Sequence, residues 1–187
     1  MRVLQAFRAT LLFAAAALLV ACASVTGQRV MTFSEADMAR LLEQHGPFQR
    51  RLMEVLDVKV NRPSVRLLPG SNRLASAFEV VATERVSHRT LSGRLAIEYG
   101  LRYDQEDQAI RMTQVKVNDL VLNDVPADKR AGIRNLGTLI AENLLDDAVL
   151  YRFKASDLKN AEGHGVRPKA VDVTSRGVEV TLAPIGH

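Results

Sequence analysis

The side chains most able to do chemistry in this sequence are spaced in ways that do not suit catalysis. The four histidines share no HxxxH-type spacing, as two zinc ligands on one helix face would: His45, His88, His164 and His187. Asp146–Asp147 and Glu106–Asp107 are adjacent pairs, and adjacent side chains on a helix or strand point apart. No G-x-S-x-G elbow or phosphate-binding loop is present. We therefore expect a protein that is not an enzyme, with no metal and no cofactor.

The only cysteine, Cys22, follows a segment that has the order of a bacterial export signal. Residues 1–10 contain Arg2 and Arg8 and no acid, residues 11–20 are an unbroken apolar run, and small residues follow at 21–24. A membrane-spanning helix needs roughly 20 apolar residues, about twice the length of this run. The pattern favours a cleaved signal peptide over a membrane span.

Leu19-Val20-Ala21-Cys22 resembles the lipobox of bacterial lipoproteins. In that family the signal is cleaved before the cysteine, whose sulfur receives a diacylglycerol and whose new amino group is acylated, for example with palmitate. Several acyl chains anchor a protein stably to a membrane. Ala23 in the second mature position, instead of Asp, implies the outer membrane. The alternative is ordinary cleavage after Ala23, since Ala21-Cys22-Ala23 has the A-x-A form, and that cleavage would discard Cys22.

Composition limits the partners of the mature chain. Cleavage before Cys22 leaves 166 of the 187 residues, which is enough for one domain with a real core. It also removes two arginines, so the formal net charge falls from +4 to +2. With Cys22 acylated no thiol remains, which excludes disulfides and thiolate metal sites. The low charge, the absence of Trp and the envelope location all disfavour nucleic acid as a partner.

We divide the chain into a signal peptide at 1–21, the acylated cysteine and a tether at 22–31, and a single domain at 32–187. In the domain, residues 33–46 predict an amphipathic helix with Ser34 as N-cap, Asp37 at the third helical position and Met38 on the apolar face. Residues 58–68 contain Pro63 and end at a Pro-Gly pair, so we expect an edge strand there.

Residues 91–104 are the clearest strand, because apolar and polar residues alternate over about 13 positions. In the next strand Met112 and Val115 fall on opposite parities, which predicts a bulge and a bent sheet. A second helix over 127–147 carries apolar residues on more than one side, and Gly132 and Gly137 favour close packing against another element. Short strands follow near 149–153, 170–174 and 178–182.

Two segments carry a resemblance to a known family: LAIEYGLRYD with AIRMTQVKVNDL, and the helix 127–147 with AVLY after it. They resemble the YceB-like bacterial lipoproteins, a family defined by a domain of unknown function. The resemblance implies a fold similar to tubular lipid-binding domains. We therefore expect an α+β fold in which a highly curved antiparallel β-sheet wraps around the long helix of the C-terminal half, with an amphipathic helix at the N-terminal side.

The resemblance also implies an apolar cavity for a lipid or other hydrophobic ligand. Its expected lining comes from the long strands and the second helix: Phe78, Leu95, Ile97, Tyr99, Leu101, Ile133, Leu136, Ile140 and Leu144. The same residues also suit an ordinary filled core. Five basic residues form either a contact for lipid headgroups or a solvated face: Lys129, Arg130, Arg134, Arg167 and Lys169.

We expect a lipid-anchored protein that faces the periplasm of a Gram-negative bacterium, with the membrane as partner through its acyl chains. The alternative is an envelope lipoprotein that assembles with another protein through its outer surface, with a filled core and no ligand.

Overall fold

The computed structural model describes residues 28–45, 49–52, 56–123, 125–159 and 165–185. The predicted signal peptide, Cys22, His164 and His187 lie outside the described residues. The first strand, β1 (Arg29–Phe33), pairs with the last strand of the chain. The fold therefore includes residues 29–31, which the sequence analysis assigned to the tether.

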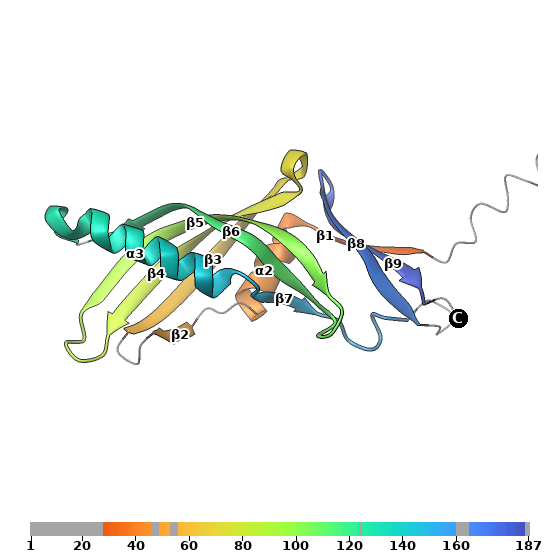
Figure 1. Ribbon diagram of the computed structural model, residues 1–187, viewed down its shortest axis with the longest axis horizontal. Helices are drawn as coiled ribbons and strands as arrows, with labels where there is room; N and C mark the ends of the chain where they lie inside the picture. The colour runs from red at the N-terminus through yellow and green to blue at the C-terminus, as the bar shows by residue number, and fades with distance from the viewer. Residues whose placement is uncertain (1–27, 46–48, 53–55, 124, 160–164, 186–187) are drawn as a thin grey trace, which may run out of the picture.

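The larger of two sheets is antiparallel and strongly curled, with the strand order β2-β3-β4-β5-β6-β7 (Figure 1). Its strands are β2 (Gln49–Leu52), β3 (Leu56–Leu68), β4 (Arg73–Glu84), β5 (Thr90–Asp104), β6 (Ala109–Leu122) and β7 (Val149–Arg152), with a short 3-10 turn at Pro69–Ser71. Alternation along β4 and β5 places one set of side chains inside the curl, where Phe78 lies opposite Leu95 and Leu74 opposite Tyr99. All four are buried. The predicted α+β class and the curved antiparallel sheet are confirmed.

Irregular pairing in β6 explains part of the curvature. The register of β5 against β6 shifts twice, between Ala96 and Ile97 and again between Glu98 and Gly100. Gln114 lies in the second shift and has a φ of 50°. Bulges of this kind bend a strand and increase its twist, so the bulge predicted from the parity change is confirmed.

Pro63 lies in an irregular part of β3. The pairing of β3 with β4 shifts between Asn61 and Ser64, which tolerates a residue without an N–H donor. β2 pairs with β3 only between Leu56 and Lys59, and among the described strands the rest of β3, which includes Pro63, pairs with β4 alone and so forms the expected edge.

The helix α2 (Glu35–His45) begins after Ser34 in a reciprocal capping arrangement. Ser34 Oγ accepts the Asp37 N–H at 3.2 Å, and Asp37 Oδ2 accepts the Ser34 N–H at 3.0 Å. Met38 and Leu42 on its apolar face are buried in the same core as the residues of β4 and β5. The helix contacts β3 and β7, so it bridges the two sides of the curled sheet.

The second helix, α3 (Ala127–Leu145), lies along β6 (Figure 1). Leu145 is its one fully buried residue, while Leu136 and Leu139 are 57% and 59% exposed. The sequence analysis expected the sheet to wrap around this helix. Instead, α2 contributes to the core inside the curl and α3 covers an edge of the sheet.

A three-stranded sheet with the order β1-β9-β8 forms the other end of the molecule (Figure 1). β8 (Val166–Thr174) and β9 (Gly177–Pro184) pair antiparallel, and β9 also pairs with β1. A second cluster of buried side chains joins this sheet to the main one through Ile110 of β6 and Phe153. The molecule is elongated, with the start of α3 at one end and the small sheet at the other.

Candidate functional site

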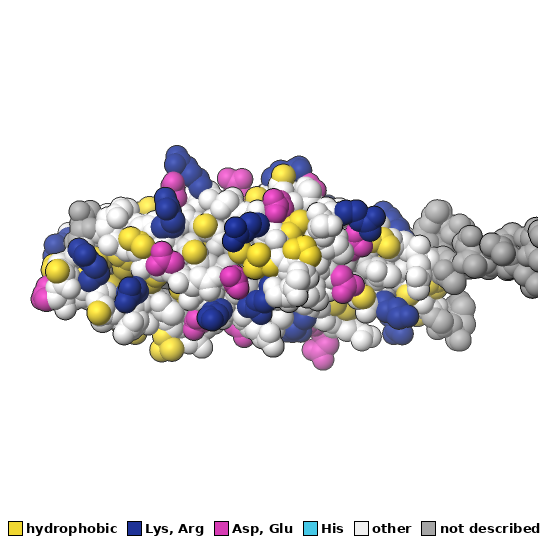
Figure 2. Space-filling model, turned by 90° about the horizontal axis from the view of Figure 1, so that it is seen from above, with side chains coloured by type: hydrophobic (Ala, Val, Ile, Leu, Met, Phe, Trp, Pro, Cys, Tyr) yellow, Lys and Arg dark blue, Asp and Glu magenta, His cyan; other side chains and the backbone are white. Residues whose placement is uncertain are grey.

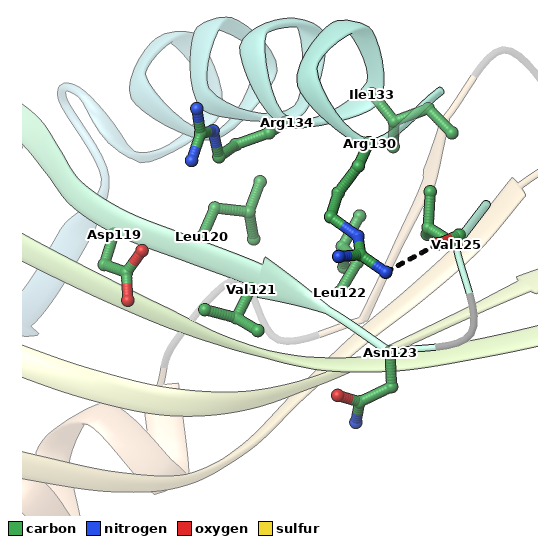
Figure 3. Close-up of a pocket in the computed structure, with 9 residues that line it drawn as sticks. All are labelled: Asp119, Leu120, Val121, Leu122, Asn123, Val125, Arg130, Ile133 and Arg134. Atoms are coloured by element: carbon green, nitrogen blue, oxygen red, sulfur yellow. Dashed lines mark hydrogen bonds between the residues drawn. The ribbon is translucent and has the colours of Figure 1, made fainter. Parts of the chain in front are cut away.

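A cavity of about 550 Å³ lies where β6 ends and α3 begins (Figure 3). Ligand pockets typically measure 300–1,000 Å³, so the volume suits a small molecule. Residues from the end of β6, the connecting loop and the first two turns of α3 line it: Asp119, Leu120, Val121, Leu122, Asn123, Val125, Arg130, Ile133 and Arg134.

The loop before α3 sets one end of this cavity. Val125 is buried, and Pro126 occupies the N-cap position of the helix, close to the first helical position expected from the sequence. The backbone oxygen of Val125 accepts a hydrogen bond from Arg130 Nη2 at 3.2 Å. Figure 3 shows Arg130 reaching from α3 down toward Val125 and Leu122. Arg130 therefore lies across the space between helix and strand.

Gly137 sets the distance between α3 and the cavity floor. A Cβ added at this glycine would lie 2.6 Å from Leu120 Cδ2, so the leucine side chain would have to shift to make room for a larger residue. By contrast, a Cβ added at Gly132 would meet no atom within 4 Å. The expectation that glycine permits close helix packing is therefore confirmed at Gly137 and wrong at Gly132.

Hydrogen bonds from backbone N–H groups at the edge of β6 to two carboxylates fix the C-terminal part of α3 against the strand. β7 pairs with β6 between Ala109 and Arg111, and past that point α3 is the neighbour of β6. The N–H of Val117 donates to Glu142 Oε1 at 2.9 Å, and the N–H of Val115 donates to Asp146 Oδ1 at 3.3 Å. These carboxylates accept hydrogen bonds from two N–H groups of β6 that have no partner in a neighbouring strand. The cavity begins beyond them, toward Leu120.

The charge in the cavity is net positive. Arg130 and Arg134 lie one helical turn apart on α3, and Asp119 is the acid among the described lining residues. No described carboxylate lies within ion-pair distance of either arginine. Lys129, one position before Arg130, is exposed and is not part of the lining.

On one face of the molecule, positive charge is mixed with negative charge. On the face shown in Figure 2, basic and acidic side chains are interspersed, with no extended patch of one sign. Arg167 and Lys169 belong to β8, at the end of the molecule opposite the start of α3 (Figure 1). The fold thus separates them from Arg130 and Arg134, with which the sequence analysis had grouped them.

The nine predicted lining residues fall into three environments. Ile133 lines the cavity. Four residues belong to the closed core inside the curl: Phe78, Leu95, Ile97 and Tyr99. Leu101 is half-buried against that core, Ile140 is half-buried on α3, and Leu136 and Leu144 are exposed.

The strand side of the cavity is formed by residues outside the predicted lining. Leu120, Leu122 and Val125 form its apolar floor, and Leu120 and Leu122 have the alternate spacing of a strand that covers a core. The sequence pattern that could have identified this floor is a second parity shift, between Val117 and Leu120. At this shift the inward-facing apolar residues of β6 change from odd-numbered to even-numbered positions.

At the centre of the curl the hydroxyls of Ser76 and Tyr99 are hydrogen-bonded at 3.1 Å. Both residues are buried, and Ser76 is the buried polar residue among apolar neighbours. Burial raises the pKa of the Tyr99 hydroxyl above its ordinary value, although the hydrogen bond between Tyr99 and Ser76 acts in the opposite direction. Tyr99 is therefore a neutral member of the core, and its hydrogen bond offsets the cost of burying two hydroxyls.

The adjacent carboxylates hold loops in place. Asp107 and Asp147 both pair with Arg111, which joins the β5–β6 turn to the segment after α3. Asp146 is the C-cap of α3, as expected for a helix end. Asp104 completes the cluster through its ion pair with Arg111 at 2.9 Å. These pairs stabilise the fold on the side of β6 away from the cavity.

Within the described residues, no group of three or more histidines, cysteines, aspartates and glutamates is placed to hold a metal ion. Over the same residues, neither helix is long and apolar enough to cross a membrane.

Comparison with known proteins leaves the family of this chain open. No family model and no curated protein matches it. A similar solved structure is a "Crystal structure of lipopolysaccharide binding protein", with 12% sequence identity and a TM-score of 0.32. The match covers 87% of this chain and 50% of that chain, so the chain spans half the length of that structure. A TM-score this low does not establish a shared fold, and the relation to YceB-like lipoproteins remains a prediction.

Proposed function

We propose that this protein binds a lipid or another hydrophobic molecule in the cavity between β6 and α3, without catalysing a reaction. The observation that carries the proposal is the apolar floor of the cavity, formed by Leu120, Leu122, Val125 and Ile133. Burial of each methylene of an acyl chain contributes about 0.8 kcal/mol. The cavity is open at the side, so a chain can enter without a rearrangement of the core.

The location of the protein is part of the same proposal. The export signal and the lipobox that ends at Cys22 support anchoring by acyl chains, in the outer membrane and facing the periplasm. Expression in a Gram-negative host with radiolabelled palmitate tests this directly. We expect label on the wild-type chain and none on a Cys22→Ser variant. Label retained by the variant would contradict the assignment.

Ligand binding is tested with a photoactivatable acyl chain and peptide mapping. The full chain is purified from envelope in mild detergent, the probe is added and cross-linked, and labelled peptides are identified by mass spectrometry. We expect label in peptides that contain residues 119–134. Label spread evenly over the surface, or absent, would contradict the proposal.

Two variants on the same helix sharpen this test. Ile133 lines the cavity, while Leu136, three residues further along α3, is 57% exposed and does not. We expect Ile133→Asp to remove most of the labelling and Leu136→Asp to retain it. Both side chains lie outside the closed core, so neither change should unfold the protein, which circular dichroism would verify.

A second function, assembly with another envelope protein, is favoured by a different observation. Leu136 and Leu139 are large apolar side chains exposed on α3, where a partner protein can reach them. Under this hypothesis Leu136→Asp with Leu139→Asp would abolish co-purification of one defined protein. The photoactivatable probe would then give no labelling specific to the cavity.

A further inference from the structure

The two arginines that line the cavity stand out because the described structure gives them no acidic partner. Arg130 makes one hydrogen bond, to the backbone oxygen of Val125, and the guanidinium of Arg134 lies above Leu120 (Figure 3). Like charges four residues apart on a helix repel each other. Two such residues facing one cavity therefore favour an anion between them.

We propose that Arg130 and Arg134 bind the phosphate headgroup of the ligand, so that the cavity selects amphiphiles with a phosphate over neutral ones. This inference rests on the proposed function, because the apolar floor holds the acyl chain. The planar guanidinium presents donors that match the oxygens of a phosphate in pairs. Arg130 and Arg134, four positions apart on α3, thus supply the head site on the helix side of the tail site.

The headgroup is a phosphate monoester rather than a carboxylate because the site presents two separate guanidiniums. A phosphate monoester carries about −1.5 to −2 charges at neutral pH and three acceptor oxygens, as a phosphorylated side chain does. It can contact Arg130 and Arg134 together. A carboxylate has two oxygens and one charge, which one guanidinium satisfies.

The other charged groups near the cavity limit where the headgroup lies. Asp119 lines the same space, and Figure 3 shows it near Leu120 on the strand side. It repels an anion from the strand, which directs the phosphate to the helix side. The adjoining recess on the outer face of the sheet is lined by Glu79, Arg94 and the same Asp119, so its net charge is negative and it does not favour a phosphate.

Three probes with the same oleoyl chain test the inference on the full chain: oleoyl glycerol phosphate, oleate and oleoyl glycerol. Each competes with the photoactivatable chain for the cavity. We expect the phosphate monoester to compete at a concentration at least tenfold lower than oleoyl glycerol, with oleate between them. Higher salt should narrow the difference, because the contacts are partly exposed to solvent.

The double variant Arg130→Gln with Arg134→Gln should bind oleoyl glycerol phosphate no better than oleoyl glycerol. Lys129→Gln is the matched control, since Lys129 is a neighbouring cation outside the lining. It should keep the wild-type preference. An equal loss in the control would overturn the inference, because the effect would then come from the net charge of the helix.

The remaining outcomes separate the inference from the proposed function. If all three probes compete equally, the headgroup site is overturned and hydrophobic binding stands. If none competes, the proposed function itself fails. Inorganic phosphate provides a further test. Displacement of oleoyl glycerol phosphate by millimolar inorganic phosphate, with no competition by oleoyl glycerol, would mean that the site recognises free phosphate and would overturn the lipid assignment.

Discussion

Glu142 Oε1 of α3 accepts the backbone N–H of Val117 in β6 at 2.9 Å. A helix side chain here takes the place of a neighbouring strand. The contact is one of the links that hold α3 along the sheet edge and so keep the cavity walls apart by a constant distance. Edge N–H groups that lack a partner also attract other strands, so the helix both builds the site and protects the edge.

Removal of this carboxylate should cost stability. We expect Glu142→Ala to lower the free energy of unfolding by about 1–3 kcal/mol, because a part-buried N–H is left without an acceptor. Glu142→Gln keeps an oxygen in the same place and should cost less than half as much. Urea denaturation measures both. Equal losses for the two variants would show that the hydrogen bond to Val117 is not the cause.

The two glycines of α3 should respond oppositely to the same change. Gly132→Ala should stabilise the protein by about 0.5–1 kcal/mol, because alanine is the better helix former and its methyl group meets no atom within 4 Å. Gly137→Ala should gain nothing or destabilise, because its methyl group would push Leu120 aside. Thermal unfolding of the pair is the measurement. Two equal gains would contradict the close contact at Gly137.

Gly93 lies where the backbones of β5 and β6 approach each other closely. A Cβ at this position would lie 2.2 Å from the backbone oxygen of Val121, which cannot rotate away as a side chain can. We expect Gly93→Ala to destabilise the protein by about 2 kcal/mol or more and to disturb the end of β6 that lines the cavity. At Gly100 the nearest atom is a methyl of Thr113 at 3.2 Å, so Gly100→Ala is the milder comparison in the same strand. Denaturant titration would detect the difference, and similar losses at both sites would argue against it.

The buried Ser76–Tyr99 hydrogen bond should behave as a coupled pair. Tyr99→Phe leaves the serine hydroxyl buried without its partner, and Ser76→Ala does the same to the tyrosine hydroxyl. Each single change should cost about 1–3 kcal/mol. The double variant should cost clearly less than the sum of the two, because no hydroxyl is then left unsatisfied. An additive result from a double-mutant cycle would exclude the coupling.

The contact between Tyr151 and Asp157 makes stability depend on pH at both extremes. Burial, together with the bond to Asp157, raises the pKa of the Tyr151 hydroxyl to about 12, from an ordinary value of 10.0. Burial alone would raise the pKa of Asp157, but the Lys154 N–H and the Tyr151 hydroxyl, which donates at 2.7 Å, lower it below its ordinary value of 3.8.

The sign of each effect follows from linkage. The tyrosine contribution is complete below about pH 10 and is lost as the pH rises toward about 12. The aspartate contribution is complete above its ordinary pKa of 3.8 and is lost as the pH falls through its lower folded value. We expect Tyr151→Phe to flatten the alkaline limb of a stability profile, and Asp157→Asn to flatten the acid limb. Unchanged limbs in melting curves across this range would contradict the assignment.

Local patterns in the sequence were sufficient to predict the longest elements, but not the short strands β1 and β2. Alternation over residues 91–104 predicted β5, the parity change after Met112 predicted a bulge, and the apolar spacing of 127–147 predicted α3. These signals are readable because period and turn chemistry act between residues close together in the chain. The prediction that Cys22 is acylated likewise rests on residues close to it in the chain, those of the export signal and the lipobox.

Only the tertiary structure decided which apolar residues face a cavity. Leu95 and Ile133 both lie on apolar faces in the sequence, yet the first is sealed in the core and the second lines an open space. The difference depends on where α2 and α3 pack, and that depends on contacts such as Glu142 with Val117 and Gly137 with Leu120, which join separate elements. The sequence determines which faces avoid water, but long-range packing determines whether protein atoms fill the space beside them.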